Sequence, residues 1–352
     1  MPSRQHPNAG ARIEDVAAHA GVSRGTVSNV LNHPERVTEK TLKRVQQAIT
    51  ELAFVQNGNA RALAGQRSET IGLVVTGLDH SYSIEIAGGA QAEAAGAQKH
   101  LLLANTDNQL RFQDEHLDFF DQARVAGILL SPMRDSHAAI ERMRSHGRPV
   151  VLINYHEEHE GTCTVVVDNE RVGALGAQHM VDLGRRRIAF VAGGDEHLQP
   201  IKERRVGVRR VIAGSPSILE EINADVLSAD DGARVARDLL ERPAADRPDA
   251  VIAGTDLIAA AIIRELDGNG VSIPENIAVM GLDANTFAWG GAVPLTTVYT
   301  RGRDLGAEGV RLLLSEIDDP PGTHEHRSIV LEPTLIARES TLGRTPHTET
   351  TR

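Results

Sequence analysis

The sequence predicts an all-α helix-turn-helix headpiece followed by an α/β body built of doubly wound layers. Three observations lead to this prediction. Residues 13–31, IEDVAAHAGVSRGTVSNVL, are typical of two short helices that meet at a fixed corner. The first 70 residues are basic, whereas the rest of the chain is acidic. From Glu69 onward, short apolar runs alternate with helix-like segments.

The corner between the two helices depends on small residues at fixed positions. Ala17 lies where the first helix must approach the second, and Gly21 lies where the chain turns, because a residue without Cβ adopts positive φ at little cost. The Ser23 hydroxyl is suited to accept the N–H of Gly25 or Thr26 and so to cap the second helix. The apolar contacts are expected from Val16, Val27, Val30 and Leu31. A helical hairpin of another kind shares some of these features but not the whole set.

The formal net charge of −11 is unevenly distributed. Residues 1–70 carry nine Lys or Arg against six Asp or Glu, which gives +3, and the remainder carries −14. A basic headpiece on an acidic body confines the attraction for phosphates to the headpiece. Aromatic residues make up only 3% of the chain, so no stacking platform for single-stranded nucleic acid is indicated.

Cysteine content and hydropathy narrow the class of protein. Cys163 is the single cysteine, which excludes an internal disulfide and a zinc site made of several cysteines. The N-terminal segment MPSRQHPNAG lacks the apolar core of a signal peptide, and the longest later apolar run, Leu257–Ile263, is too short to cross a bilayer. We therefore expect a soluble, cytoplasmic protein.

Periodicity places helices at 13–20, 23–32 and 39–53, the third with Thr38 as N-cap and an apolar face. The apolar face consists of Leu42, Val45, Ile49 and Leu52. Residues 54–68 are polar and predict a linker, in which NARALAG is too short for a stable isolated helix. Buried parallel strands are predicted at 71–75, 101–105, 127–130, 150–154, 188–192, 250–253 and 277–281. Helices between them are predicted at 84–98, 114–122, 170–183 and 257–269.

Polar residues gather where the predicted strands end: Asp79, Asn105 to Asp107, Ser131, Asn154, Thr255, Asp256 and Asp283. Ligands of open α/β sheets bind beyond the carboxyl ends of the strands, so this pattern favours a small-molecule cleft. Exposed loops are also polar, and for any single residue that explanation is about as good.

Other motifs give no support for catalysis or metal binding. The segments His156–His159 and His324–His326 are each interpreted as solvated charged turns rather than metal sites. Gly193 and Gly194 follow a strand without the remaining glycines of a dinucleotide fingerprint, and neither a P-loop nor a G-x-S-x-G motif is present. The sequence therefore predicts no enzyme activity, no cofactor and no metal.

Over residues 12–340 the sequence resembles the lactose-repressor (LacI/GalR) family of transcription regulators. The motifs that carry the resemblance are IEDVAAHAGVSRGTVSNVLN, VTEKTLKRVQQAITELAF, NARALAG before IGLVV, VVVDNERVGALGAQHMVDLGRRRIAFV, RPDAVIAGTDLIAAAIIRELDGNGVSIPENIAVMGLD and PLTTV. The resemblance implies a homodimer on a palindromic operator, and a periplasmic-binding-protein-like effector domain of two doubly wound subdomains joined by three crossings. The tail carries no leucine heptads, so we expect a dimer without a tetramerising coiled coil.

The resemblance also implies the DNA-binding residues. The recognition helix begins near Ser23 and places Arg24, Gly25, Thr26 and Asn29 at base-contacting positions; Arg24 suits a guanine and Asn29 an adenine or a phosphate. Phosphate contacts are implied around Ile13, Ser28, Asn32 and Asn57. Residues 57–65, with Ala60, match the family's hinge helix, and Leu63 matches the leucine that wedges into the minor groove. Gln56 and Gly58 depart from the family, and the glycine makes helix formation costlier by ~1 kcal/mol.

For the effector, the resemblance implies Asp79, Tyr82, Asn105, Asp107, Arg204, Thr255, Asp256 and Asp283. The expected effector is a sugar or a related polar metabolite. The loop DHSYS and Thr255 depart from sugar-binding members, which argues against a simple sugar and leaves the identity of the effector open. The expected boundaries are 1–11 disordered, 12–56 DNA-binding, 57–68 hinge and linker, 69–340 effector-binding and dimerisation, and 341–352 disordered. A transport receptor with the body's fold is the alternative; the basic headpiece and the lack of a signal peptide argue against it.

Overall fold

The computed structural model describes residues 11–54, 68–78, 81–156, 161–193, 198–224, 227–284, 293–320 and 322–343. The chain divides into two compact units between Ser68 and Glu69. The hinge residues Asn57, Ala60 and Leu63 and the loop residue Asp79 lie outside the described residues. Within the described ranges, no helix is both long and apolar enough to cross a membrane.

The headpiece is built of three α-helices, as the sequence predicts: α1 (Ile13–Ala20), α2 (Arg24–Asn32) and α3 (Glu39–Glu51), with a 3₁₀ turn at Pro34–Arg36. Their inward faces form one apolar core, which contains Val16, Ala17, Ala20, Val27, Val30, Val45 and Ala48. The predicted caps are present: Ser23 Oγ accepts the Thr26 N–H (3.1 Å), and Thr38 Oγ1 accepts the Thr41 N–H (3.4 Å). These bonds satisfy N–H groups that the first turn of each helix leaves without a partner.

Gly21 makes the turn between α1 and α2. Its φ of +60° lies in the left-handed region, and its N–H closes the end of α1 on the carbonyls of Ala17 and Ala18. A Cβ at this position would meet no other atom within 4 Å. The constraint on Gly21 is therefore one of backbone conformation and not of space.

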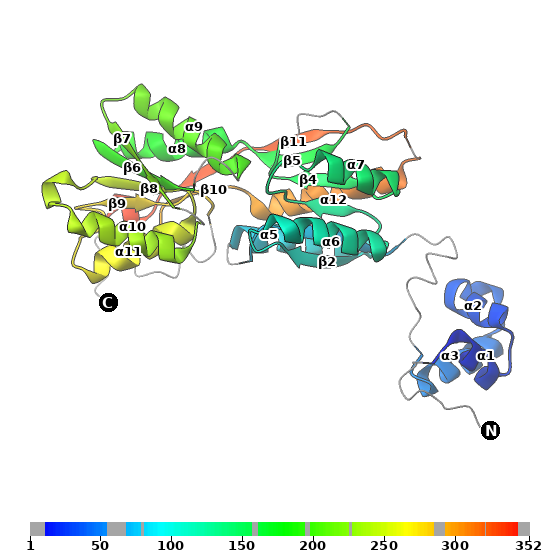
Figure 1. Cartoon of the computed structure of the whole chain (residues 1–352). Helices are drawn as coiled ribbons and strands as arrows, with labels where there is room; N and C mark the ends of the chain where they lie inside the picture. The colour runs from blue at the N-terminus through cyan, green and yellow to red at the C-terminus, as the bar shows by residue number, and fades with distance from the viewer. Residues whose placement is uncertain are drawn as a thin grey trace, which may run out of the picture. The chain divides into compact units, whose positions relative to one another are not determined.

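The body begins with a six-stranded parallel sheet in the order β11-β5-β4-β3-β1-β2 (Figure 1), counted over the described ranges. Its strands are β1 (Thr70–Val75), β2 (His100–Asn105), β3 (Ile128–Leu130), β4 (Val150–Ile153), β5 (Cys163–Val167) and β11 (Ser328–Leu331). Helices α5 (Ser81–Gly96) and α12 (Gly302–Asp318) pack on one face, and α6 (Leu110–Gln122) and α7 (His137–Ser145) pack on the other. Side chains of β1 divide between the two cores, because alternate residues of a strand point to opposite faces.

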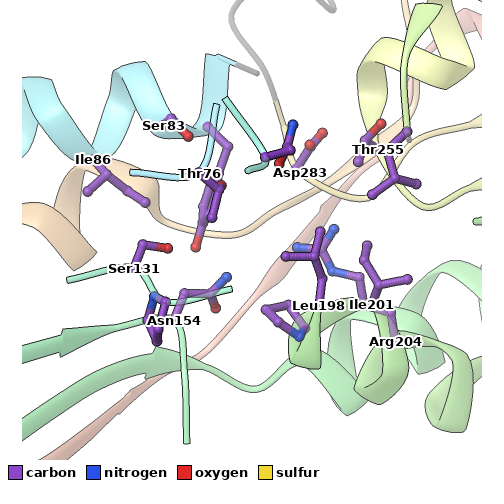
Figure 2. A pocket seen from close by; sticks show the side chains of 15 residues that line it. Thr76, Ser83, Ile86, Ser131, Asn154, Leu198, Ile201, Arg204, Thr255 and Asp283 are labelled. Carbon is purple, nitrogen blue, oxygen red and sulfur yellow. The ribbon is translucent and has the colours of Figure 1, made fainter. Parts of the chain in front are cut away.

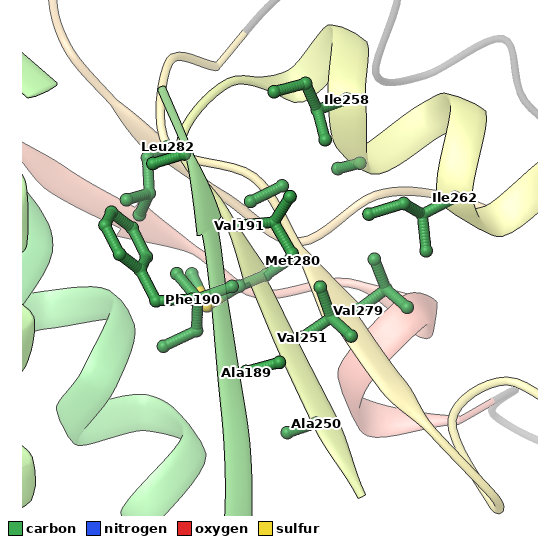
Figure 3. Packing of buried hydrophobic residues seen from close by; sticks show 14 of the residues in the cluster. Ala189, Phe190, Val191, Ala250, Val251, Ile258, Ile262, Val279, Met280 and Leu282 are labelled. Atoms are coloured by element: carbon green, nitrogen blue, oxygen red, sulfur yellow. The ribbon is translucent and has the colours of Figure 1, made fainter. Parts of the chain in front are cut away.

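The second lobe holds a four-stranded parallel sheet, order β7-β6-β8-β9, in the described part of the chain. Its strands are β6 (Arg187–Ala192), β7 (Ile218–Asn223), β8 (Ala250–Ala253) and β9 (Ala278–Met280). The helices α8 (Asn169–Asp182) and α9 (Gln199–Ala213) cover one face, and α10 (Ala229–Glu241) and α11 (Asp256–Gly268) cover the other (Figure 1). Figure 3 shows the cores on both faces of this sheet. Val251 and Val279 lie on the side of Ile258 and Ile262 of α11, whereas Phe190 and Met280 point to the opposite face, toward α8 and α9.

The chain passes between the lobes three times over the described residues: after β5, between β10 (Thr297–Tyr299) and α12, and between β11 and β12 (Thr334–Ile336). A 3₁₀ turn at Ala244–Asp246 precedes β8. The last helix, α13 (Glu339–Leu342), buries Thr341 against Thr296, with 2.7 Å between their hydroxyl oxygens. The expected boundary at residue 340 falls inside α13, which continues to Leu342.

All seven predicted strands are present and parallel, with bounds that differ by a residue or so. The seven predicted strands do not include β5, β7, β10, β11 or β12. β5 is buried throughout, but its five residues lie close after another short strand; β7 is an edge strand with exposed Glu221 and Asn223, which gives it little apolar signal.

Substituting the two glycines of the corner with alanine is expected to have opposite effects. Gly21→Ala places a side chain at φ +60° and should destabilise the headpiece by about 1–2 kcal/mol. Gly25→Ala adds the same methyl group inside α2, where only Ser23 Oγ lies near (3.7 Å), and should stabilise it by up to about 1 kcal/mol. Hydrogen exchange of the α1–α3 amides in the full chain measures both. Changes of the same sign would contradict this account of the turn.

Candidate DNA-binding helix and ligand cleft

One face of α2 is polar and the opposite face is apolar. Val27 and Val30 are buried, whereas Arg24, Gly25 and Asn29 are exposed. Positions 24, 25, 28, 29 and 32 recur at helical spacing, so these side chains share one stripe. Within the stripe, Asn32 Nδ2 donates to Ser28 Oγ (3.2 Å). The stripe offers guanidinium, amide and hydroxyl groups on a helix of the width that fits a major groove.

The other predicted DNA contacts of the headpiece have roles within it. The Arg24 side chain is 70% exposed, and its Nε lies 3.2 Å from Glu14 Oε1. An exposed ion pair of this kind contributes little, so Arg24 can exchange it for a base. The hydroxyls of Ser23 and Thr26 lie 2.9 Å apart in the cap of α2. The Ile13 side chain packs against the headpiece core.

The body contains a cleft of about 680 Å³, counted to its open mouth, between the carboxyl ends of the strands of the two lobes. Figure 2 shows Thr76, Ser83, Ser131 and Asn154 on the first lobe and Leu198, Ile201 and Arg204 on the second, with Thr255 and Asp283 beside them. The remaining lining residues are Tyr82, Ile86, Asn108, Pro132, Pro200 and Leu227. Several hydroxyl and amide groups and one pair of opposite charges thus face an otherwise apolar cleft.

Arg204 is held in the cleft by a hydrogen-bonded chain between the lobes. Only 3% of this residue is exposed. Its Nε donates to Asn169 Oδ1 (3.0 Å) and its Nη1 to the Gly254 carbonyl (2.8 Å), while Asn169 Nδ2 donates to Asn154 Oδ1 (3.0 Å). Gly173 allows α9 to approach, since a Cβ there would lie 1.9 Å from the Arg204 carbonyl oxygen. A buried charge is costly unless it is hydrogen-bonded, and this chain supplies the bonds.

The carboxylate of Asp283 is held at the start of α11. Its Oδ1 accepts the Asp256 N–H (2.7 Å), at the helix end where negative charge is favoured. Asp256 Oδ1 accepts the Thr297 hydroxyl (2.6 Å) and the Asp283 N–H (3.3 Å). Thr255 caps the same helix, its Oγ1 accepting the Ile258 N–H (3.4 Å). Asp283 is therefore fixed in orientation before any ligand arrives.

Tyr82 brings a buried polar atom to the first lobe's side of the cleft. Its hydroxyl is buried and has no hydrogen-bond partner among the described residues. Burial raises the pKa of Tyr82, an effect that Arg204 opposes and that Asp283 and Glu85 reinforce, so the phenol stays protonated. Burial, and then Asp283, raise the pKa of the nearby Glu85. The Tyr82 hydroxyl is thus available to donate to a ligand in the cleft.

Comparison with known proteins matches both units. Residues 12–57 match the model of the bacterial regulatory proteins of the lacI family, and residues 177–341 match a periplasmic binding protein-like domain. The HTH-type transcriptional regulator DegA of Bacillus subtilis is 31% identical over 334 residues, which span 94% of this chain and 97% of DegA. The chain belongs to the LacI family of bacterial regulatory proteins.

Two further proteins are similar to this chain over nearly its whole length. The HTH-type transcriptional repressor PurR of Photobacterium profundum is 29% identical over 94% of this chain and 98% of its own length. The solved structure of the transcriptional regulator CelR in complex with cellobiose matches with a TM-score of 0.67 and 29% identity, over 94% of this chain and 99% of that one. The resemblance inferred from the sequence motifs is thus confirmed over nearly the whole chain.

The structure brings some of the effector residues implied by the LacI resemblance together and not others. Tyr82, Arg204, Thr255 and Asp283 line the cleft. Asp256 does not line it but holds Asp283. Asn105 and Asp107 also lie outside the lining: Asn105 Oδ1 accepts the Asp107 N–H (3.1 Å), and Asp107 is exposed. Asp79 lies outside the described residues.

Other lining residues were not assigned a ligand role from the sequence. Ser131 and Asn154 were noted as polar strand ends, which was the signal that could have found them. Thr76 follows β1 in the same way, whereas Ser83 lies in α5 and carries no such signal. The apolar side chains contributed by the start of α9 become visible only when the two lobes are placed together.

The two histidine segments that the sequence predicts to be solvated turns, His156–His159 and His324–His326, differ in exposure. His156 is exposed at 3.9 Å from Glu203 Oε1, and Glu157 to His159 lie outside the described residues. The interpretation of His324–His326 as a solvated turn is wrong for His324. Its side chain is only 9% exposed, because the turn folds back over the edge of the first sheet.

Asn169→Ala should destabilise the body more than an ordinary loss of one asparagine. The Arg204 Nε would be left buried without its acceptor, which costs about 2–3 kcal/mol. Urea unfolding followed by circular dichroism measures the change. Asn269→Ala, which removes an exposed bond to the Glu265 carbonyl (2.8 Å), is the matched control and should cost about 0.5 kcal/mol or less. Equal costs would mean that the chain from Asn154 to Arg204 does not hold the lobes.

Proposed function

We propose that this LacI-family protein is a transcriptional repressor that binds a palindromic operator as a homodimer and responds to a small polar molecule in the cleft. The observation that carries this proposal is the polar stripe on α2. It offers groups that can bind base edges, on a headpiece joined to a body with a ligand cleft. A transport receptor would not need that headpiece. An enzyme is disfavoured because the relatives that span the whole chain are regulators by name. Action on chromosomal DNA places the protein in the cytoplasm.

In this proposal, α2 lies in the major groove with its polar stripe toward the bases. Arg24 donates two hydrogen bonds to a guanine, and Asn29 contacts an adenine or a phosphate. Gly25 has no side chain and permits close approach of the backbone to the DNA. Thr26 lies in the first turn of α2 beside Arg24, near the bases. Ser23, Ser28, Asn32 and the start of α1 at Ile13 hold the phosphates and set the register.

The linker is proposed to complete the DNA interface. Asn57, Ala60 and Leu63 belong to a segment that folds as a hinge helix only on the operator, where Leu63 of each subunit wedges into the minor groove. The same segment is too short to be stable alone. A ligand that favours one arrangement of the two lobes would change the spacing of the two hinges, and DNA affinity with it.

Arg24→Ala should lower sequence specificity rather than affinity alone. Operators selected from a random duplex library supply the probe, and fluorescence anisotropy measures binding to the selected and to scrambled duplexes at fixed salt. Loss of a bidentate contact is worth about 1–3 kcal/mol, so the specific affinity should fall about 10- to 100-fold while non-specific binding changes little. Lys43→Ala removes one exposed positive charge of α3 and should lower both affinities equally. An equal loss for Arg24→Ala would contradict the assignment.

The cleft is proposed to bind a sugar or a related polar metabolite. Asp283 accepts hydrogen bonds from hydroxyl groups of the ligand, and Arg204 and Tyr82 donate to its oxygens. The apolar face supplied by Ile86, Leu198 and other lining residues suits a carbon skeleton. The CelR–cellobiose complex supports this class of ligand. Asn105, Asp107 and Asp79 stay candidates for contacts made when the lobes move together.

Asp283→Asn should abolish the response to the effector. A thermal-shift screen of sugars, sugar phosphates, nucleosides and sugar acids identifies the ligand, which at about 100 times its Kd stabilises the wild-type chain by about 2.7 kcal/mol. The amide keeps the oxygen that accepts the Asp256 N–H but removes the charge and one acceptor. Asp267→Asn, an exposed exchange of the same kind in α11, should leave the shift unchanged. An undiminished shift in Asp283→Asn would place the ligand elsewhere.

A further inference from the structure

Four side chains with metal-ligating atoms converge at one edge of the first sheet. Cys163 is the first residue of β5, Glu316 lies in the last turn of α12, and His324 and His326 lie in the turn before β11. Strands β5 and β11 are neighbours, with Thr164 opposite Ser328, so the two turns that precede them lie together. One ligating atom from each of the four residues falls within 4.8 Å of all the others.

The distances agree with a tetrahedral centre. Cys163 Sγ lies 3.2 Å from His324 Nε2 and 3.7 Å from His326 Nδ1. With Zn–S of about 2.3 Å and Zn–N of about 2.0–2.1 Å, a tetrahedron places sulfur and nitrogen about 3.6 Å apart. Glu316 Oε2 lies 4.0 Å from His326 Nδ1, and since all four ligating atoms lie within 4.8 Å of one another, a side-chain shift of about 1 Å completes the set.

The tautomer of His324 is set for metal binding. Its Nδ1 lies 2.7 Å from Asp319 Oδ2. A carboxylate only accepts hydrogen bonds, so Nδ1 carries the proton and Nε2 presents its lone pair toward Cys163. A carboxylate behind a histidine in this way is the usual support of a metal-binding imidazole.

The charges at the cluster also suit a divalent cation. Glu316 Oε2 is buried and has no hydrogen-bond partner among the described residues. Its other oxygen, Oε1, lies 3.5 Å from Arg144 Nη2, so the carboxylate is only half-satisfied. Burial raises the pKa of the Cys163 thiol, and a bound cation reverses that effect by stabilising the thiolate. Thiolate and carboxylate together balance a charge of +2, and Arg144 has a second carboxylate nearby, with its Nη1 3.9 Å from Glu141 Oε1.

We propose that Cys163, Glu316, His324 and His326 form a binding site for Zn²⁺ or a similar divalent transition metal. Thiolate and imidazole ligands select such ions over Mg²⁺ and Ca²⁺. Four protein ligands leave no open position, as in structural rather than catalytic zinc sites. The site lies at the amino edge of the parallel sheet, the edge at which β1 begins directly after the linker. It is distinct from the cleft, which lies at the carboxyl ends of the strands.

Titration of the metal-free full chain with Co²⁺ tests the site, because a tetrahedral thiolate complex absorbs by sulfur-to-cobalt charge transfer and by intense d–d transitions in the visible. We expect saturation at one Co²⁺ per chain and displacement by Zn²⁺. Cys163→Ser should remove the charge-transfer band, and His326→Ala should lower the Co²⁺ affinity at least 100-fold. Asp319→Asn, which changes only the support of His324, should lower it about 10- to 100-fold.

His100→Gln is the matched control, since His100 is an exposed histidine at the amino end of β2 on the same sheet edge. It should leave the titration unchanged. Circular dichroism melting of each metal-free variant shows that it is folded. The proposal is overturned if Co²⁺ gives no charge-transfer band, or if a folded Cys163→Ser variant retains the band. Equal losses in His100→Gln and His326→Ala would likewise indicate adventitious binding to surface histidines.

Discussion

The guanidinium of Arg204 can lie buried in the cleft only because the second lobe supplies its hydrogen-bond acceptors and the first lobe holds one of them in place. Asn169 at the start of α8 and the carbonyl of Gly254 bind it from the second lobe, and Asn154 of the first lobe holds Asn169. A buried charge without these partners would cost several kcal/mol. The hydrogen bonds that stabilise the Arg204 charge therefore also hold the two lobes together. They lie where the chain first crosses from one lobe to the other.

Asp283 is a buried negative charge that is likewise held by hydrogen bonds. Its carboxylate lies at the start of α11 and accepts the backbone N–H of Asp256, while the Asp256 carboxylate accepts the backbone N–H of Asp283, so a ligand does not have to order it. Preorganised polar groups of this kind increase affinity by lowering the entropy lost on binding. The headpiece follows a simpler rule: one left-handed residue, Gly21, sets the angle between α1 and α2, and a small apolar core holds it.

Local chemistry made the headpiece and the parallel strands predictable. Gly21, the cap at Ser23 and the apolar spacing of α3 each act within a few residues, so a sequence window contains the whole signal. The cleft was predictable only in part. Thr255 and Asp283 follow strands and were found, whereas Ser83 lies in α5 and Leu198 directly precedes α9. Asn105 ends a strand, but its side chain binds the Asp107 N–H of its own loop and does not line the cleft.

By itself, then, the sequence determined the three headpiece helices and seven of the strands, that basic charge is confined to the headpiece, and which family's motifs the chain carries. Only the tertiary structure decided which strand ends meet. It separated Asp256, a support, from Asp283, a wall of the cleft. It also joined Cys163 to His324 across 161 positions through the pairing of β5 with β11. Strand order depends on how distant apolar faces pack, and no local window of residues records that packing.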